Sequence, residues 1–443
     1  MVSRGAVLAG VSVLLALVAA VALTNGLMSD EVANPIVEEP KIRNVTIGVI
    51  PGMPSSLPSY TFLTRLAEDD INKYCVDEGL AYRFRFNVSE PVEQSPDALR
   101  YTKKFLSSGV KVILGFEWSS HLCSGARIFG YNKTMVLMSP SASSSTYSIV
   151  NDTLYRLCPT DFEPLEVTLK AMSYRGVKAV VAFSVYSNTE YNFNALIKRQ
   201  LALLGIEHYA SVTSPALTQD FPILDVERLL DRADSAVAEA IQKYGANSTA
   251  VLFLPGDVDP AFSWSTDDPN PSIREVVEAA AKRPSLSSVT WYGLEVSARQ
   301  KAYEEMPEGV AAKLKMISSV ESFTPTPIYD RVNALWLASK EAPPNAASLN
   351  TYTANIYDGL WVLSLSVIEA NSTEPLPLMS VIPGVASGYV GATGRCTLDD
   401  AGDRLGADFN FYYYAVVDGV TKSVKLGSYG WEADQFTWSD AER

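Results

Sequence analysis

The sequence predicts an α/β protein built as two doubly wound parallel-sheet lobes joined by a hinge, with an apolar helix at its N-terminus. Three observations predict this class. The 443 residues exceed the size at which a single hydrophobic core stops growing, so two lobes are expected. Short continuous apolar runs alternate with stretches of helical spacing, as in strands that are buried on both faces of a parallel sheet. This alternation occurs in two successive arrays of similar size.

The composition narrows the function classes. Only 36 Lys and Arg residues stand against 50 Asp and Glu residues, a net charge of −14, which argues against a nucleic-acid binder. The two histidines, His121 and His208, cannot form a multi-histidine metal centre and leave few ways to build a histidine-dependent catalyst. The chain has no P-loop, no GxGxxG motif and no Gly-x-Ser-x-Gly elbow around the serines beside His121. The sequence therefore predicts neither an enzyme nor a cofactor.

The N-terminus indicates the compartment. Residues 5–23 form an apolar run of 19 residues, which as a helix spans about 28 Å, one hydrocarbon core. Arg4 before the run and acidic residues after it orient the rest of the chain outward. An uncleaved membrane anchor and a cleaved signal peptide over residues 1–24 both fit, and Arg4-Gly5-Ala6 also resembles archaeal prepilin-like signals. All three alternatives place the body at the extracellular face of the membrane, anchored or secreted.

Sequons and cysteines agree with export. Asn-x-Ser/Thr sequons mark acceptor sites on the surface of exported proteins. Six of them begin at Asn44, Asn87, Asn132, Asn151, Asn247 and Asn371. The four cysteines can pair in an oxidising compartment. One possible pairing joins Cys123 to Cys158 and leaves Cys75 and Cys396 together or free.

The body alternates strands and helices. In the first array we expect strands at Val45–Gly52, Tyr82–Val88, Val110–Phe116 and Thr134–Met138, and helices at Ser59–Tyr74 and Asp97–Leu106. In the second we expect strands at Lys178–Val185, Ile206–Val212, Ala250–Leu254 and Val289–Gly293, and helices near Tyr191–Leu204, Val226–Tyr244 and Ile273–Ala281.

The last third differs, with two long helices followed by hairpin-like strands. The helices are expected near Tyr329–Lys340 and Tyr352–Ala370, and the strands at Ala392–Leu398, Phe411–Val417 and Ser423–Leu426. We expect the chain to cross between lobes more than once. The predicted division is an anchor or signal at 1–24, a tether at 25–42, lobe 1 at 43–157 plus 322–398, and lobe 2 at 158–321 plus 399–443.

Four passages resemble the type I periplasmic solute-binding proteins, specifically the branched-chain amino-acid-binding group and the related receptor ligand-binding family. They are Ala67–Asn72, then Val112–Ser120 with Met138–Ser143, then Tyr357–Gly359, and finally Gly391–Gly394 with Leu398–Asp403. The resemblance covers roughly residues 45–430 and implies two lobes that close on a ligand by a hinge motion. Pro54–Pro58 departs from the family's usual Gly-rich loop, so the ligand's identity does not carry over.

The resemblance implies a site for an amino-acid carboxylate at the turn after Val110–Phe116. A strand-to-helix turn suits an anion, because free N–H groups and the helix dipole converge there. By resemblance, Ser119 and Ser143 donate hydroxyls to the carboxylate, and the backbone around Ser141 adds an N–H. The alternative is that Ser119 caps the following helix, which does not exclude ligand contact.

The ammonium group needs an acceptor, preferably a charged one. Glu295 follows the strand Val289–Gly293 and is the best candidate, and Asp257 holds the equivalent place one strand earlier. Aromatic walls are expected from Trp118 and from Tyr191, at the start of the helix after the second lobe's first strand. Glu117 is unlike the apolar residue expected for leucine-type ligands, so either it points away or the ligand is polar.

The sequence favours an extracytoplasmic receptor that captures a small polar solute, an amino acid or related amide, in the cleft between two lobes. Its partners are then the solute, the permease of an ABC importer, and the membrane through residues 5–23, but no nucleic acid. The alternative is a cell-surface structural or sensory protein that reuses this fold and assembles through its N-terminal apolar helix.

Overall fold

The structure is a computed structural model that describes residues 41–185, 189–214, 225–255, 273–294, 309–344 and 346–439. The chain divides into two units, Met1–Ile42 and Arg43–Arg443. The predicted apolar helix at 5–23 lies outside the described residues, as does the tether at 25–42 apart from its last two residues. Within the described ranges, no helix is long and apolar enough to cross a membrane.

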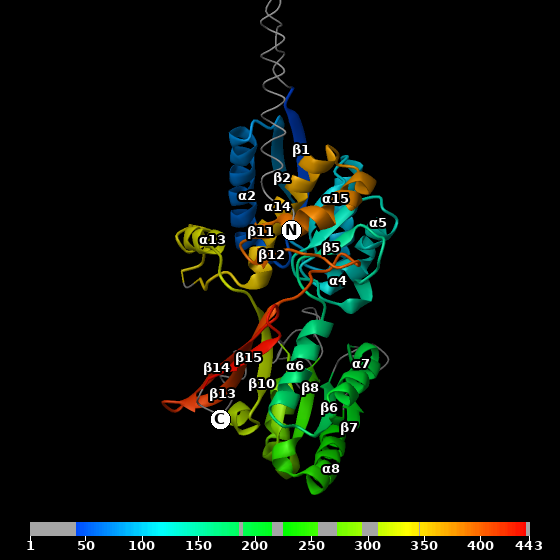
Figure 1. Ribbon diagram of the computed structural model, residues 1–443, viewed down its shortest axis with the longest axis vertical. Helices are drawn as coiled ribbons and strands as arrows, with labels where there is room; N and C mark the ends of the chain where they lie inside the picture. Colours follow the sequence, from blue (N-terminus) through cyan, green and yellow to red (C-terminus); the bar gives the residue numbers. More distant parts are fainter. Residues whose placement is uncertain are drawn as a thin grey trace, which may run out of the picture. The chain divides into compact units, whose positions relative to one another are not determined.

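The first sheet of the second unit has five parallel strands in the order β2-β1-β3-β4-β5 (Figure 1). The strands are β1 (Arg43–Ile50), β2 (Tyr82–Val88), β3 (Val112–Gly115), β4 (Val136–Ser139) and β5 (Leu154–Arg156). The helices of this lobe are α2 (Leu57–Asp77), α3 (Ser95–Ser107), α4 (Ser119–His121), α5 (Ile128–Tyr131), α13 (Pro327–Leu337), α14 (Thr351–Ala370) and α15 (Pro375–Gly388). The four strands predicted for the first array are confirmed.

Both faces of this sheet are buried, which explains its continuous apolar runs. Val112 and Leu114 pack into a core with side chains of α2 and α14. Ile113, which points to the opposite face, packs into a second core with Tyr101 and Phe105 of α3. Because successive residues of a strand point to opposite faces, a strand covered on both sides must be apolar at every position.

The second sheet has eight strands in the order β15-β14-β13-β10-β9-β8-β6-β7 (Figure 1). Its parallel part contains β6 (Ala179–Val185), β7 (Glu207–Thr213), β8 (Thr249–Pro255), β9 (Thr290–Gly293) and β10 (Ile317–Ser322). An antiparallel meander of β13 (Asp408–Val417), β14 (Val420–Gly430) and β15 (Gln435–Trp438) extends it. The helices of this lobe are α6 (Phe162–Tyr174), α7 (Thr189–Leu203), α8 (Val226–Tyr244), α9 (Ile273–Ala280), α10 (Pro284–Ser288) and α12 (Val310–Lys313).

Several elements differ from the prediction, among them β5, β15, α6 and α15, which were not predicted. The strand expected at Ala392–Leu398 is wrong: the chain there forms only the two-residue pair β11 (Val390–Gly391) and β12 (Gly394–Arg395). Strand β10 was not predicted, because its residues Ile-Ser-Ser-Val-Glu-Ser lack an apolar run. Its serines, Ser318 and Ser319, are nevertheless buried between β9 and β13.

The chain passes between the two sheets three times, which confirms the expectation of more than one crossing. The crossings follow β5, β10 and β12. A buried ion pair joins the first crossing to the third: Arg156 Nε donates to Asp403 Oδ1 at 2.5 Å, and both side chains are almost fully buried. The guanidinium also donates to the backbone oxygens of Ala142, at 3.0 Å, and Ser144, at 2.6 Å.

A second polar network anchors the third crossing to helix α14. The Asp358 carboxylate accepts from the backbone N–H of Ala392 at 2.7 Å and of Thr393 at 2.8 Å. Arg404 then donates to the Thr393 hydroxyl at 2.8 Å and to Asn355 Oδ1 at 3.0 Å. Two of the passages that carried the family resemblance, Tyr357–Gly359 and Gly391–Gly394, therefore meet in space, where they satisfy each other's buried polar groups.

The cysteine pairing proposed from the sequence is wrong. All four cysteines are free thiols. Cys158 is completely buried beside the first crossing, whereas Cys123 is exposed and interacts with the Tyr147 hydroxyl. Cys75 and Cys396 are both buried in the core of the first lobe without bonding to each other.

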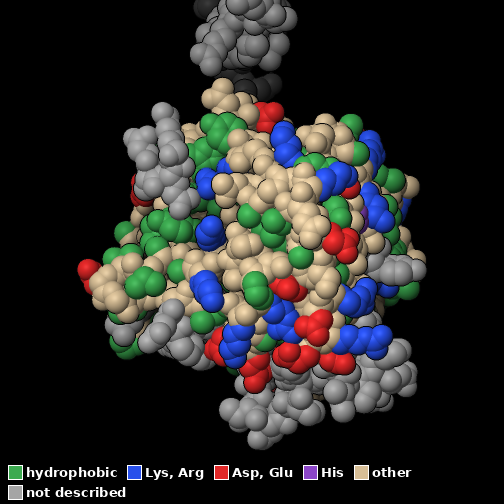
Figure 2. Space-filling model, turned by 90° about the horizontal axis from the view of Figure 1, so that it is seen from below, with side chains coloured by type: hydrophobic (Ala, Val, Ile, Leu, Met, Phe, Trp, Pro, Cys, Tyr) green, Lys and Arg blue, Asp and Glu red, His purple; other side chains and the backbone are tan. Residues whose placement is uncertain are grey.

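One face of the molecule carries side chains of both charges. On the face shown in Figure 2, Lys and Arg side chains lie among Asp and Glu side chains, so this face has no extended patch of one sign. Ion pairs such as Arg283 with Glu227 and Asp231 show the same interspersion on helix α8.

The buried ion pair predicts a large difference between two Asp→Ala substitutions. Asp403→Ala leaves the Arg156 charge buried without its partner, which should cost about 3–5 kcal/mol of unfolding free energy. Asp77→Ala breaks the exposed pair with Lys73 and should cost about 0.5 kcal/mol or less. Urea unfolding of both variants measures the difference, and similar losses in the two would show that the buried pair has no special role.

Candidate ligand-binding site

Three loops meet at the carboxyl edge of the first sheet. They follow the parallel strands β1, β3 and β4 and comprise residues 51–56, 116–120 and 140–148. Because the carboxyl ends of parallel strands lie at one edge of a sheet, this edge is where such folds place ligand-contacting residues. Trp118, Ser119, Ser141 and Ser143 all belong to these loops, so the structure brings four of the seven predicted site residues to one edge.

The turn after β3 is held by an unusual backbone conformation. Phe116 has a positive φ of 65°, and the Ser139 hydroxyl donates to the Phe116 carbonyl at 2.9 Å, which fixes the turn. A Cβ on Gly115 would lie 2.5 Å from the Ile50 oxygen, so glycine is required where β3 ends against β1. This geometry starts helix α4 directly after Trp118, whose side chain is 37% exposed and thus accessible to a ligand.

The serines differ in what their hydroxyls do. Ser119 Oγ accepts from the Ser144 N–H at 3.1 Å and keeps its own proton available for donation. Ser141 donates to the Glu117 carbonyl at 2.7 Å, and its N–H donates to Ser139 Oγ at 3.2 Å, so both of its donors already have partners. Of the donors expected from the sequence, Ser119 is therefore the one most suited to bind an anion.

Asp161 is a residue of this edge that sequence reasoning missed. It lies in the first crossing, where its N–H donates to the Ser143 carbonyl at 2.9 Å and its carboxyl group interacts with the Ser143 hydroxyl. Burial raises the pKa of this carboxyl, while Ser143 and Arg156 oppose the rise. The signal in the sequence is an acid five residues after the end of β5, which is informative only once the crossing is known.

Glu117 points away from the serines. Its carboxylate accepts from the Ser56 hydroxyl at 2.9 Å and from the Met53 backbone, in the loop after β1. A Cβ on Gly52 would lie 1.4 Å from Glu117 Oε2, so the carboxylate covers the glycine directly. Burial raises the pKa of Glu117. Of the two alternatives left open by the sequence, the structure shows the one in which this side chain turns away.

The buried Arg156 holds the loop 140–148 in place through hydrogen bonds. Beyond its bonds to the carbonyls of Ala142 and Ser144, it donates to the Ser148 hydroxyl at 2.8 Å. His121 supports the turn after β3, because its Nδ1 accepts from the Trp118 N–H at 3.5 Å. His121 is buried, and its contact with the Trp118 N–H stabilises the turn.

The predicted residues of the second lobe cannot be placed at the site. Tyr191 lies on helix α7, as expected, but its side chain is outside what the structure describes. Asp257 and Glu295 both lie outside the described residues. Their roles toward a ligand therefore stay predictions.

The fold and this serine-lined edge define a class of two-lobed α/β binding proteins. The chain matches the model of the family described as "Receptor family ligand binding region" over residues 64–415. Since the match spans well over half of the chain, the protein belongs to this family. No curated protein sequence matches it.

Solved structures agree on the fold. An ABC transporter substrate-binding protein from Desulfitobacterium hafniense in complex with Leu has a TM-score of 0.60 and 13% identity, covering 86% of this chain and 100% of its own. A leucine-binding protein from Thermotoga maritima has a TM-score of 0.58 and 13% identity, covering 86% and 98%. A putative branched-chain amino acid ABC transporter from Rhodospirillum rubrum has a TM-score of 0.57 and 14% identity, covering 86% and 100%.

These comparisons confirm the resemblance seen in the sequence motifs, because the chain has the fold of the type I periplasmic solute-binding proteins. The family is one of ligand-binding regions, and the similar structures include a substrate-binding protein and a leucine-binding protein. The prediction that this protein is not an enzyme is therefore confirmed.

Glu163, two residues after Asp161, predicts a pH dependence of stability. Its Oε1 accepts from the Gly406 N–H at 3.1 Å, its Oε2 is buried without a partner among the described residues, and burial raises its pKa from 4.5 to about 7. The native state then holds a proton that the unfolded state has released, so stability should fall as the pH rises from 4.5 to about 7.

Glu163→Gln should remove this loss and be more stable than the parent protein above pH 7, with the two equal below pH 4.5. Thermal unfolding across this pH range measures the difference. Asp69→Asn, which neutralises an exposed acid of helix α2, is the control and should leave the pH profile unchanged. A parallel pH profile for Glu163→Gln and the parent would contradict the assignment.

Proposed function

We propose that the protein is an extracytoplasmic receptor that captures a small polar solute, an amino acid or related amide, between its two lobes. The observation that carries the proposal is the juxtaposition of an available hydroxyl, Ser119, and a partly buried carboxyl group, Asp161, around Ser143 at the edge of the first sheet. A zwitterionic amino acid needs both, since its carboxylate requires donors and its ammonium group requires an acceptor.

The carboxylate of the solute would accept from the Ser119 hydroxyl. The hydrogen bonds of Arg156 to the backbone next to Ser141 and Ser143 would keep this loop in position for the carboxylate. The ammonium group would bond to Asp161, and Glu295 with Asp257 would supply further acceptors from the second lobe. More than one acid on this side would also suit a solute with an additional positive charge.

Side-chain selectivity would come from aromatic walls. Trp118 is partly exposed beside Ser119, and Tyr191 would cover the solute from helix α7. Glu117 would not contribute to selectivity directly, because Ser56 and Gly52 engage its carboxylate. A polar requirement on the solute would therefore come from Ser119 and Asp161, which would bind its carboxylate and its ammonium group, and not from the wall around its side chain.

Delivery to the permease of an ABC importer completes the proposal. The similar structures named above include substrate-binding proteins of such transporters. The protein would work outside the cell membrane, either secreted or held by residues 5–23. The asparagines of all six sequons are exposed, which supports glycosylation at the cell surface.

A thermal-shift screen of the full-length protein against amino acids, amides, urea and polyamines tests the proposal. A solute at a hundredfold excess over its dissociation constant should stabilise the protein by about 2.7 kcal/mol. No stabilising solute, together with filaments that need residues 5–24, would instead support the surface structural protein.

For a solute found in this way, titration calorimetry on three variants tests the site. Ser119→Ala should weaken binding about tenfold, by removing a hydrogen bond to a charged group, and Asp161→Asn should weaken it tenfold or more, roughly 1.5–3 kcal/mol. Ser120→Ala, the neighbouring serine, is the control and should bind normally. Unchanged affinity in both Ser119→Ala and Asp161→Asn would place the solute elsewhere.

A further inference from the structure

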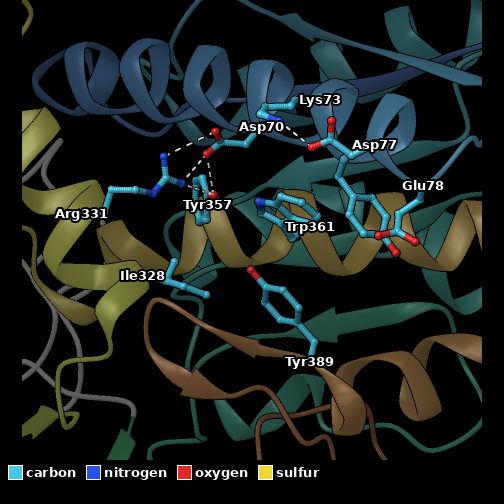
Figure 3. A pocket seen from close by; sticks show the side chains of 10 residues that line it. Asp70, Lys73, Asp77, Glu78, Ile328, Arg331, Tyr357, Trp361 and Tyr389 are labelled. Atoms are coloured by element: carbon cyan, nitrogen blue, oxygen red, sulfur yellow. Dashed lines mark hydrogen bonds and ion pairs between the residues drawn. The ribbon is translucent and has the colours of Figure 1, made fainter.

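A second pocket lies on the first lobe, away from the serine-lined edge. It has a volume of about 360 Å³ and is formed by helices α2, α13 and α14 together with Tyr389 (Figure 3). Helix α2 begins at Leu57, next to the loop at the carboxyl edge, but it contributes residues 70–77 to the pocket. At about 1.5 Å per residue, the pocket begins about 20 Å along the helix from that edge.

One end of the pocket is a closed polar cluster. Arg331 donates to the Tyr357 hydroxyl at 2.9 Å and pairs with Asp70, and the Tyr357 hydroxyl donates to Asp70 at 2.7 Å. Figure 3 shows these three side chains at one end of the pocket, with Glu78 at the other and Trp361 and Tyr389 between. Because Asp70, Arg331 and Tyr357 satisfy one another, they leave no free charge for a ligand.

The middle of the pocket is aromatic. Trp361 stacks on Tyr389 with ring centroids 6.3 Å apart and an interplanar angle of 18°. Tyr74 meets Trp361 edge-on, with centroids 5.6 Å apart and an angle of 68°. All three rings are partly exposed and line the pocket. Aromatic faces carry a negative electrostatic potential and attract cations.

The other end of the pocket is negative. Lys73 is paired with Asp77 on the surface, so these two charges offset each other. Glu78 is exposed and its carboxylate has no ion pair or hydrogen bond to any other residue that the structure describes. Glu78 also stands at the C-cap of the 21-residue helix α2, where the helix dipole places partial negative charge. The aromatic rings, the unpaired acid and the helix end therefore all favour a positive ligand.

We propose that this pocket binds a small organic ammonium ion, with its cationic head against Tyr74 and Trp361 and its charge balanced by Glu78. A cation whose charge is spread over methyl groups suits the pocket best, because it loses little hydration on meeting aromatic rings. The site is separate from the solute site proposed above and does not depend on it. A solute bound at Ser119 and an ammonium ion bound at Glu78 would occupy the protein together.

Equilibrium dialysis of the full-length protein against choline, with its neutral isostere 3,3-dimethyl-1-butanol as competitor, tests the proposal. Labelled choline should bind. The neutral alcohol should need a concentration about tenfold or more above that of unlabelled choline to displace it, which is the difference expected for a desolvated cation on aromatic rings. Equal displacement by both would show that charge is not recognised and would overturn the proposal.

Three variants locate the site. Glu78→Gln, an exposed and conservative change, should weaken choline binding several-fold, and Tyr74→Leu should do the same if circular dichroism shows it folded. Asp69→Asn removes an exposed acid of the same helix outside the pocket and should bind choline normally. Unchanged binding in Glu78→Gln would overturn the proposal. Retention of choline binding in Ser119→Ala would show that this pocket binds choline independently of the solute site.

Discussion

The buried ion pair between Arg156 and Asp403 is the interaction on which the rest of this structure depends. It joins the first and third crossings between the two sheets, and both charges are out of contact with water. Charges in such surroundings require a full set of partners, and Arg156 finds its others in the loop 142–148. The same side chain therefore connects the crossings and shapes the edge where the serines lie.

The polar network around Asp358 attaches helix α14 to the third crossing. Gly391 is needed there, because a Cβ would lie 2.1 Å from Asp358 Oδ1. Thr393 and Arg404 complete the network, so buried hydrogen bonds hold the backbone of the third crossing in addition to the apolar packing of Cys396 and Leu398. Two of the passages that resemble the family, Tyr357–Gly359 and Gly391–Gly394, therefore support the third crossing.

The loops of the serine-lined edge are held by hydrogen bonds of their own. Ser139, Ser141 and Ser119 bond to backbone groups of neighbouring loops, which fixes the loops at little further entropic cost on binding. Asp161 and Ser143 already interact, so an ammonium group would enter an existing polar contact. The aromatic pocket at Glu78 differs, since its charged groups are exposed and its apolar rings provide most of the contact.

Apolar periodicity predicted the parallel strands β1 to β4 and β6 to β9, because strands such as Val112–Gly115 must be apolar at every position when helices cover both faces. It could not predict β10, whose serines are buried only because β9 and β13 flank them. The sequence by itself determined the α/β class and the loops that carry Ser119 and Ser143. Only the tertiary structure decided that Asp161 joins them and that Glu117 turns away, because both depend on contacts between distant segments that local patterns do not encode.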